Sequence, residues 1–224
     1  NLGLERDVIQ IQDKKAMGIG LLMIDVRHTY REPLTSKKLF EWHKLLMGEN
    51  PGIKVGEWRT HKDPMQVISR AIGKQKIHFE APPSSIIVKE MNQFIKWFNE
   101  TAPGAENEIK KGPLRSAIAH LYFESIHPFE DGNGRIGRAI AEKALSQGLG
   151  RPVMLSLSRT IEPAKKEYYT ALENAQRSNE ITAWVGYFIK TTLDAQIQAG
   201  ELIDFTLKKV KFFDRFKEQL NQRQ

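Results

Sequence analysis

The chain contains 224 residues, no cysteine, and 34 Lys and Arg residues against 27 Asp and Glu residues, which gives a net charge of +7. The absence of cysteine excludes disulfide scaffolds, zinc ribbons, iron–sulfur clusters and thiol nucleophiles. The length suffices for one large domain, and the chain has neither a run of 18 apolar residues nor a secretory signal pattern. We therefore expect a cytoplasmic protein without a membrane partner, whose positive charge suits nucleic acid, a phosphate-rich ligand or an acidic protein.

Helical periodicity dominates the first hundred residues. Apolar side chains recur at intervals of three or four in residues 12–30, 36–47 and 84–99, which predicts three amphipathic helices. In the first of these helices, the expected inward face consists of Ala16, Ile19, Met23 and Val26.

One segment between these helices is typical of β-structure. Val67 on one side of Gly73, and the alternating Ile77 and Phe79 on the other, suit two short strands joined by a turn. We therefore expect a β-hairpin within a flap at about residues 58–80, and such a lone hairpin is only marginally stable by itself.

The two most apolar helices are predicted at residues 113–126 and 136–145. Helices that are apolar nearly all round are buried, so we expect a central pair joined by the short loop at residues 127–134. Further helical stretches follow at residues 159–177, 181–198 and 201–220, and the last could lead into sequence beyond the chain. Because no repeat or linker is present, the sequence predicts one all-α domain over residues 1–224, with the hairpin as a flap.

The loop between the central helices carries a phosphate-binding pattern. Gly132 and Gly134 allow positive φ and a close approach of backbone N–H groups to a ligand, so they can form an anion-binding nest. The next helix is expected to begin near Arg135, with the positive end of its dipole at the same place. Arg135 and Arg138 share a helix face, and two guanidinium groups beside such a nest suit a polyphosphate.

Two further side chains within the same 12 residues add catalytic chemistry. Asp131 immediately precedes the nest, and a carboxylate beside phosphate oxygens is the usual way to hold Mg²⁺. His127 begins the loop, and its ordinary pKa of ~6.5 suits a general base at neutral pH. Each of these residues alone has an ordinary structural explanation, but their clustering indicates a site. Gly132, Gly134 and Gly137 also fit the dinucleotide fingerprint G-x-G-x-x-G, which we reject because a helix, and not a strand, precedes them.

The run His127-Pro-Phe-x-Asp-Gly-Asn-Gly-Arg-x-x-Arg138 resembles the complete signature of the Fic (AMP-transferase) family, of bacterial type. The likeness extends over about residues 15–200 and includes the run Gly56-Glu-Trp-Arg-Thr60. The resemblance implies an all-α domain that binds ATP with Mg²⁺ and transfers AMP to a Ser, Thr or Tyr hydroxyl of a target protein, with release of pyrophosphate. The hairpin would present that target protein by pairing with its backbone.

The resemblance also implies a role for individual residues. His127 would deprotonate the target hydroxyl, Asp131 would hold Mg²⁺, and Arg138 would contact the γ-phosphate. ATP would be bound by Gly132, Asn133, Gly134, Arg135, Ile136, Gly137, Arg138, Tyr168, Tyr169 and Gln176. Within this set, the two tyrosines resemble the pair that lines the adenine site, and Gln176 stands where many members have Asn.

Several alternatives stay open at this point. The pair Gly134-Arg135 favours AMP transfer, because relatives of the Doc toxin kind, which transfer phosphate, carry Lys near this position. Transfer of another nucleotide or of phosphocholine, and removal of AMP, are compatible with the same loop. A non-catalytic basic module that binds nucleic acid is the rival from another class, less favoured because few aromatic side chains accompany the basic residues. It rests on the cluster of Lys208, Lys209, Lys211, Arg215 and Lys217.

Many Fic proteins carry an inhibitory helix with the pattern Ser/Thr-x-x-x-Glu-Gly/Asn. The only partial match is Ser158-x-x-x-Glu162, which fails because Pro163 follows. We therefore expect Arg138 to be free for the γ-phosphate, and the non-Met start favours an inhibitory helix upstream of Asn1. A homo-oligomer is also compatible with the sequence.

Overall fold

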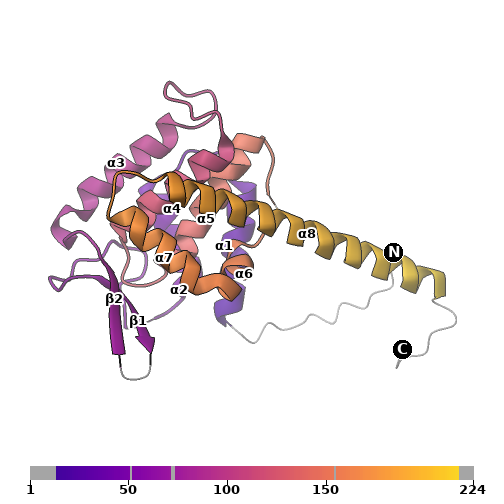
Figure 1. Cartoon of the computed structure of the whole chain (residues 1–224), viewed down its shortest axis with the longest axis horizontal. Helices are drawn as coiled ribbons and strands as arrows, with labels where there is room; N and C mark the ends of the chain where they lie inside the picture. Colours follow the sequence, from indigo (N-terminus) through magenta and orange to yellow (C-terminus); the bar gives the residue numbers. More distant parts are fainter. Residues whose placement is uncertain (1–13, 51, 72–73, 154, 217–224) are drawn as a thin grey trace.

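The computed structural model describes residues 14–50, 52–71, 74–153 and 155–216 (Figure 1). Their elements are α1 (Lys14–His28), α2 (Ser36–Met47), β1 (Gln66–Ala71), β2 (Lys74–Glu80), the 3-10 helix η1 (Ser84–Ile86), α3 (Ile87–Glu100), α4 (Gly112–Ile126), α5 (Asn133–Leu149), α6 (Leu157–Ile161), the 3-10 helix η2 (Glu162–Ala164), α7 (Lys165–Gln176) and α8 (Thr182–Phe216). The predicted all-α class with a single hairpin is confirmed. Among the described helices, none combines the length and the apolar composition that a membrane crossing requires.

Helices α4 and α5 form the predicted central pair, in the middle of the body in Figure 1. Gly112 at the start of α4 faces Gly148 near the end of α5, where an added Cβ on Gly148 would lie 2.7 Å from the Cα of Gly112. The two helices therefore approach closely and divide the interior. One apolar cluster lies between this pair and α1–α3, and a second lies between the pair and α6–α8.

The buried face of helix α1 agrees in part with the one its periodicity predicts. Val26 is buried and Met23 packs against the core as expected, but Ala16 is exposed, Ile19 is 41% exposed, and Leu22 is buried in their place. The reason is Gly18, which lies against the carbonyl oxygen of Leu45 and lets α1 approach the backbone of α2. A glycine carries no apolar weight in a sequence pattern, so the pattern placed Ala16 and Ile19 inward although they are exposed.

Substitution of two neighbouring glycines tests this close approach. We expect Gly18→Ala to lower the free energy of unfolding by about 1–3 kcal/mol, because its methyl group would overlap backbone atoms of α2. Gly20→Ala is the matched control, since nothing lies within 4 Å of the added atom. That control is expected to raise the free energy of unfolding by about 0.5–1 kcal/mol. Urea denaturation measures both changes, and equal changes of the same sign would contradict the packing.

The C-terminal helices differ from the predicted stretches in two places. The stretch at residues 159–177 is divided into α6, η2 and α7, because Pro163 has no N–H group and interrupts the α-helical ladder. The stretches at 181–198 and 201–220 are one helix, α8, which runs through Gly200 at a cost of about 1 kcal/mol relative to Ala. The predicted end of the last helix, residues 217–220, lies outside the described residues.

The last part of α8 extends away from the helical body in Figure 1. Lys208, Lys209, Lys211 and Arg215 are exposed there, as the predicted basic cluster requires. Large apolar side chains such as Phe205 are exposed among them. Lys217, the fifth member of the cluster, lies outside the described residues.

The predicted hairpin is present as an antiparallel pair of β1 and β2. Val67 pairs with Phe79 and Ile68 with Ile77, with a bulge between the two pairs. The predicted turn at Gly73 falls on residues 72–73, outside the described residues. The base of β2 lies against α7, so the hairpin borders the pocket described next.

Candidate active site

The loop from His127 to Gly132 is held in shape by side chains at its end. Gly132 has a φ of +83° and precedes the first residue of α5, where a Cβ would crowd Leu46 and Met47. Asn133 is 3% exposed, and its amide accepts from the N–H of Phe129 (2.9 Å) and donates to the carbonyl oxygen of the same residue (2.8 Å). The asparagine side chain thus closes the loop, and the N–H groups of Arg135 and Ile136 donate to the carbonyl oxygen of Gly132 (3.1 and 3.0 Å). The N–H groups of the two residues before them, at the start of α5, have no carbonyl partner within the helix.

A buried histidine on α2, His43, contacts this loop on its inner side. The Nδ1 atom of His43 accepts from the N–H of Gly56 (2.8 Å), and its Nε2 atom lies 3.2 Å from the carbonyl oxygen of Asp131. Its ring stacks on Phe129 with centroids 4.1 Å apart. The sequence assigned no role to His43, because its contact with the loop, at Asp131, lies 88 residues away.

His127 occupies an unusual backbone conformation at the end of α4. It is the only non-glycine residue with positive φ (50°) among the described ranges. The guanidinium group of Arg59 fixes this turn: its Nε donates to the carbonyl oxygen of His127 (2.8 Å), and a second nitrogen donates to that of Pro82. The backbone N–H of Arg59 also donates to the carbonyl oxygen of Pro128 (2.9 Å).

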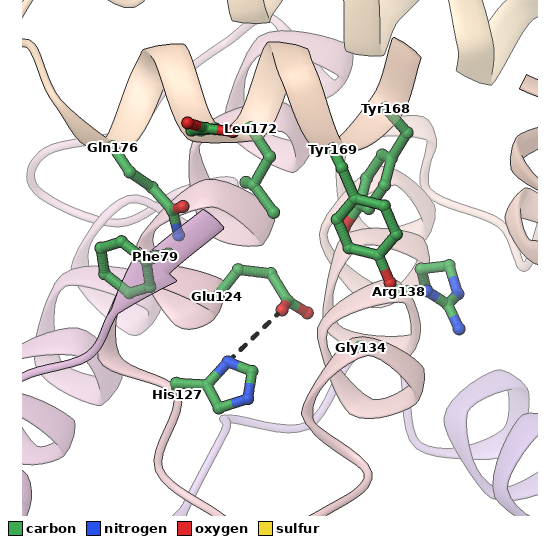
Figure 2. A pocket seen from close by; sticks show the side chains of 10 residues that line it. Phe79, Glu124, His127, Gly134, Arg138, Tyr168, Tyr169, Leu172 and Gln176 are labelled. Atoms are coloured by element: carbon green, nitrogen blue, oxygen red, sulfur yellow. Dashed lines mark ion pairs between the residues drawn. The ribbon is translucent and has the colours of Figure 1, made fainter. Parts of the chain in front are cut away.

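A pocket opens where α4, α5, α7 and β2 meet (Figure 2). Its lining consists of Phe79, Glu124, His127, Gly134, Arg138, Tyr168, Tyr169, Leu172, Glu173 and Gln176. In Figure 2, the side chains of α7 lie above the pocket, and Glu124 of α4 and His127, at the end of that helix, face them from below. The start of α5 therefore lies beside a histidine and beneath two tyrosines.

The pocket brings together six of the residues expected in the site. They are His127, Gly134, Arg138, Tyr168, Tyr169 and Gln176, and they come from α5, α7 and the end of α4. Ile136 is fully buried in the apolar core, and Gly137 lies against Glu124 and His120. The side of α5 that carries Ile136 and Gly137 therefore faces the interior, and any contact with ATP from these two residues involves backbone atoms.

The two arginines of the loop engage different partners. Arg135 pairs with Asp131, with 3.2 Å between guanidinium nitrogen and carboxylate oxygen, at an exposed position. The Nε of Arg138 donates to the hydroxyl of Ser158 (2.8 Å). A second cavity shares Arg138 with the pocket and is also lined by Ser158 and Glu162. The segment that partly matches the inhibitory pattern, Ser158–Glu162, therefore lies near Arg138 in space. Its contact with the arginine is the hydrogen bond to the serine hydroxyl.

Burial controls the protonation of the groups at the base of the pocket. It lowers the pKa of His127 to about 4, so the imidazole is neutral at pH 7 and can accept a proton. It raises the pKa of Glu124 to about 7 and lowers the pKa of His120 to about 3. The Nε2 atom of His120 is 2.8 Å from the hydroxyl oxygen of Tyr168, one of the two tyrosines that line the pocket.

Asp131 is the carboxylate nearest to the start of α5 by sequence. Its side chain is 59% exposed, and one oxygen accepts from the N–H of Gly132 (2.6 Å). No group of three or more acidic, His or Cys side chains suited to a metal occurs within the described part of the chain. The single exposed carboxylate of Asp131 fits Mg²⁺, which binds through one or two carboxylates together with phosphate oxygens of a nucleotide.

Comparisons with known proteins agree with this geometry. The chain matches the Fic/DOC family over residues 33–145. It is 27% identical over 160 residues to the protein adenylyltransferase fic-1 of Caenorhabditis briggsae, covering 71% of this chain and 27% of that protein. It is 29% identical over 147 residues to the protein adenylyltransferase Fic of Culex quinquefasciatus, covering 65% and 25%. The chain thus spans about a quarter of the length of these relatives.

Solved structures are similar in fold. A Fic family protein from Desulfovibrio desulfuricans aligns with a TM-score of 0.63 and 24% identity, over 82% of this chain and 53% of that one. Fic-1 from Caenorhabditis elegans aligns with a TM-score of 0.62 and 20% identity, over 86% and 52%. The family match spans half of the chain, and it contains the loop and most of the helices that hold it. The chain belongs to the Fic/DOC family.

Proposed function

We propose that this chain is a protein adenylyltransferase that transfers AMP from Mg·ATP to a Ser, Thr or Tyr hydroxyl of a target protein. One observation carries the proposal: a neutral, buried histidine lines the same pocket as Gly134 and Arg138 at the start of α5. The relatives named protein adenylyltransferase support the same activity. The activity is proposed for the domain over residues 1–224.

The proposed reaction is a displacement at the α-phosphorus of ATP. The target oxygen forms a bond to that phosphorus, the bond to the bridging oxygen of pyrophosphate breaks, and His127 takes the hydroxyl proton. Arg138 and the first N–H groups of α5 would bind the negative charge of the phosphates. Such chemistry depends mostly on positioning and on electrostatic stabilisation, which the rigid α4–α5 pair provides.

Asp131 would hold Mg²⁺ together with phosphate oxygens of the nucleotide. The ion, when bound, would neutralise part of the phosphate charge. The pairing of Asp131 with Arg135 is solvent-exposed, and exposed ion pairs contribute only about 0–1 kcal/mol, so exchange of this partner for Mg²⁺ costs little.

The remaining pocket residues suit the nucleoside. Tyr168 and Tyr169 stand at a centroid distance of 5.2 Å in an edge-to-face arrangement, and Gln176 lies two turns further along α7. Aromatic side chains and an amide are suited to stacking on and hydrogen bonding with a base. The hairpin, which borders the pocket through Phe79, would pair with the backbone of the target protein.

Mass spectrometry tests the proposal directly. The chain is incubated with Mg·ATP and a cell lysate, and proteins are examined for a gain of one AMP. Modified Ser, Thr or Tyr residues would support the proposal. A gain of one phosphate would instead indicate phosphate transfer, and salt-sensitive retention of DNA without nucleotide binding would indicate the basic module.

Replacement of Arg138 tests its assignment to the phosphates. Arg138→Ala is expected to raise the KM for ATP about 10–150-fold, because a charged hydrogen bond contributes about 1.5–3 kcal/mol. Arg159→Ala on α6 is the matched control, an exposed arginine outside this pocket, and should leave the KM unchanged. Steady-state kinetics with ATP as the varied substrate measures both, and equal KM values would remove Arg138 from the binding site.

A further inference from the structure

Glu124 lies one helical turn before His127, on the pocket side of α4. Its Oε2 atom is 3.9 Å from the Nδ1 atom of the histidine, a contact marked by the dashed line in Figure 2, which becomes an ion pair when the imidazole is protonated. Both residues line the pocket, and the carboxylate lies beneath it, with a side chain only 6% exposed. Glu124 belongs to α4, and the positive-φ turn that follows the helix places the His127 ring beside it.

The imidazole nitrogen that faces the carboxylate is unpaired. Among the described residues, Nδ1 of His127 is a buried side-chain atom without a hydrogen bond, and so is the other carboxylate oxygen of Glu124, Oε1, which lies against Gly137. Buried polar atoms are nearly always paired, so each exception needs an explanation. Catalytic hydrogen bonds are often long before substrate binds and tighten afterwards, and a movement of about 1 Å would close this one.

The neighbouring helix leaves room for the carboxylate. Gly137 of α5 lies against Glu124, and an added Cβ on this glycine would overlap the Oε1 atom. The glycine thus leaves space for the carboxyl group of Glu124. A buried carboxylate without a hydrogen bond lowers the stability of the fold. Among the side chains that face the carboxylate, His127 is the one in the pocket with an unpaired ring nitrogen directed at it.

We infer that Glu124 is a positioning residue that holds Nδ1–H of His127, so that Nε2 faces the target hydroxyl as the proton acceptor. This inference rests on the proposed function. The hydroxyl proton moves to Nε2, the imidazole becomes positively charged, and the carboxylate of Glu124 stabilises that charge through Nδ1–H. No proton moves to Glu124 itself.

Glu124→Gln tests the inference, with Glu142→Gln as the matched control. Glu142 is a second buried glutamate, on α5 and outside the pocket, whose pKa burial raises to about 8. Glu124→Gln is expected to lower kcat about 10–1,000-fold while the KM for ATP stays within about two-fold. Glu142→Gln is expected to leave both constants unchanged. A kcat for Glu124→Gln within two-fold of wild type would overturn the inference.

Thermal stability separates positioning from a structural role. The folded pKa of Glu124 is raised above 4.5, so its contribution to stability is present below pH 4.5 and is lost as pH rises through about 7. The charged groups and titratable side chains that face Glu124 are His120, His127, Arg138 and Tyr168. At pH 8 the variant should therefore have a Tm equal to or above that of wild type while kcat falls. A joint fall of Tm and kcat would assign Glu124 a structural role and overturn the inference.

A measurement on the unmodified protein keeps the inference testable if the variant does not fold. The ¹⁵N spectrum of the imidazole rings reports which nitrogen of His127 carries the proton. We expect Nδ1–H in the wild-type protein, and Nε2–H would overturn the inference. Failure of the proposed function is recognised separately, by the absence of AMP transfer from the wild-type chain. Failure of the inference about Glu124 is recognised by the variants and the tautomer when the wild-type chain does transfer AMP.

Discussion

His127→Ala is expected to reduce AMP transfer by about 10²–10⁴-fold while the affinity for ATP stays within about two-fold of wild type. The imidazole is the group in the pocket whose lowered pKa leaves it neutral and able to accept a proton at pH 7. It lies at the end of α4, whereas the expected phosphate contacts come from α5, so its loss should affect the chemical step. Transfer of label from ATP labelled at the α-phosphate measures the rate, and calorimetric titration measures the affinity.

His28→Ala is the control for this prediction, because His28 is exposed at the end of α1, away from the pocket. Its rate and its ATP affinity should equal those of the wild-type chain. Full transfer by His127→Ala would contradict the assignment of the base. A loss of ATP affinity equal to the loss of rate would indicate that the imidazole binds substrate and does not accept the proton.

The loop that contributes to the pocket could be found from the sequence because its parts are contiguous. His127, Asp131, the two glycines and both arginines fall within 12 residues, and their spacing alone predicts a phosphate site. The central helix pair was also predictable, since the apolar composition of α4 and α5 leaves little choice but burial. Both predictions depend on local patterns, which a sequence displays directly.

The residues that support the loop could not be predicted, because they come from distant segments. His43 and Arg59 reach the loop from 88 and 68 residues away, and neither belongs to a local pattern of chemistry. Glu124 had a weak signal, as a lone acid in an apolar helix three residues before the histidine. The inward placement of Ala16 and Ile19 in α1 was wrong for a related reason: Gly18 fixes the buried face through close packing, which no hydrophobic pattern records.

Arg59 connects three segments that the chain brings together only on folding. It is 2% exposed, and its guanidinium group donates to the carbonyl oxygens of His127 and Pro82. The last carbonyl groups of a helix have no partner within the helix, and the guanidinium group lies at that end of α4. Burial lowers the pKa of Arg59, but the shift leaves a guanidinium group charged at pH 7, and a buried charge is tolerated when it is hydrogen-bonded.

Arg59→Ala is therefore expected to lower the free energy of unfolding by about 2–5 kcal/mol, since each buried carbonyl left without a donor costs about 1–3 kcal/mol. For a chain of this size the Tm should fall by about 4–20 °C, measured by calorimetry. Arg31→Ala, an exposed arginine that contacts Gly150, is the control and should change the Tm by less than about 2 °C. Because Arg59 also fixes the positive φ of His127, Arg59→Lys should recover part of the Tm but not the full kcat: an ammonium group cannot reproduce the fork that reaches both carbonyl groups. Recovery of full activity by lysine would show that the turn at His127 is held by the helix end alone.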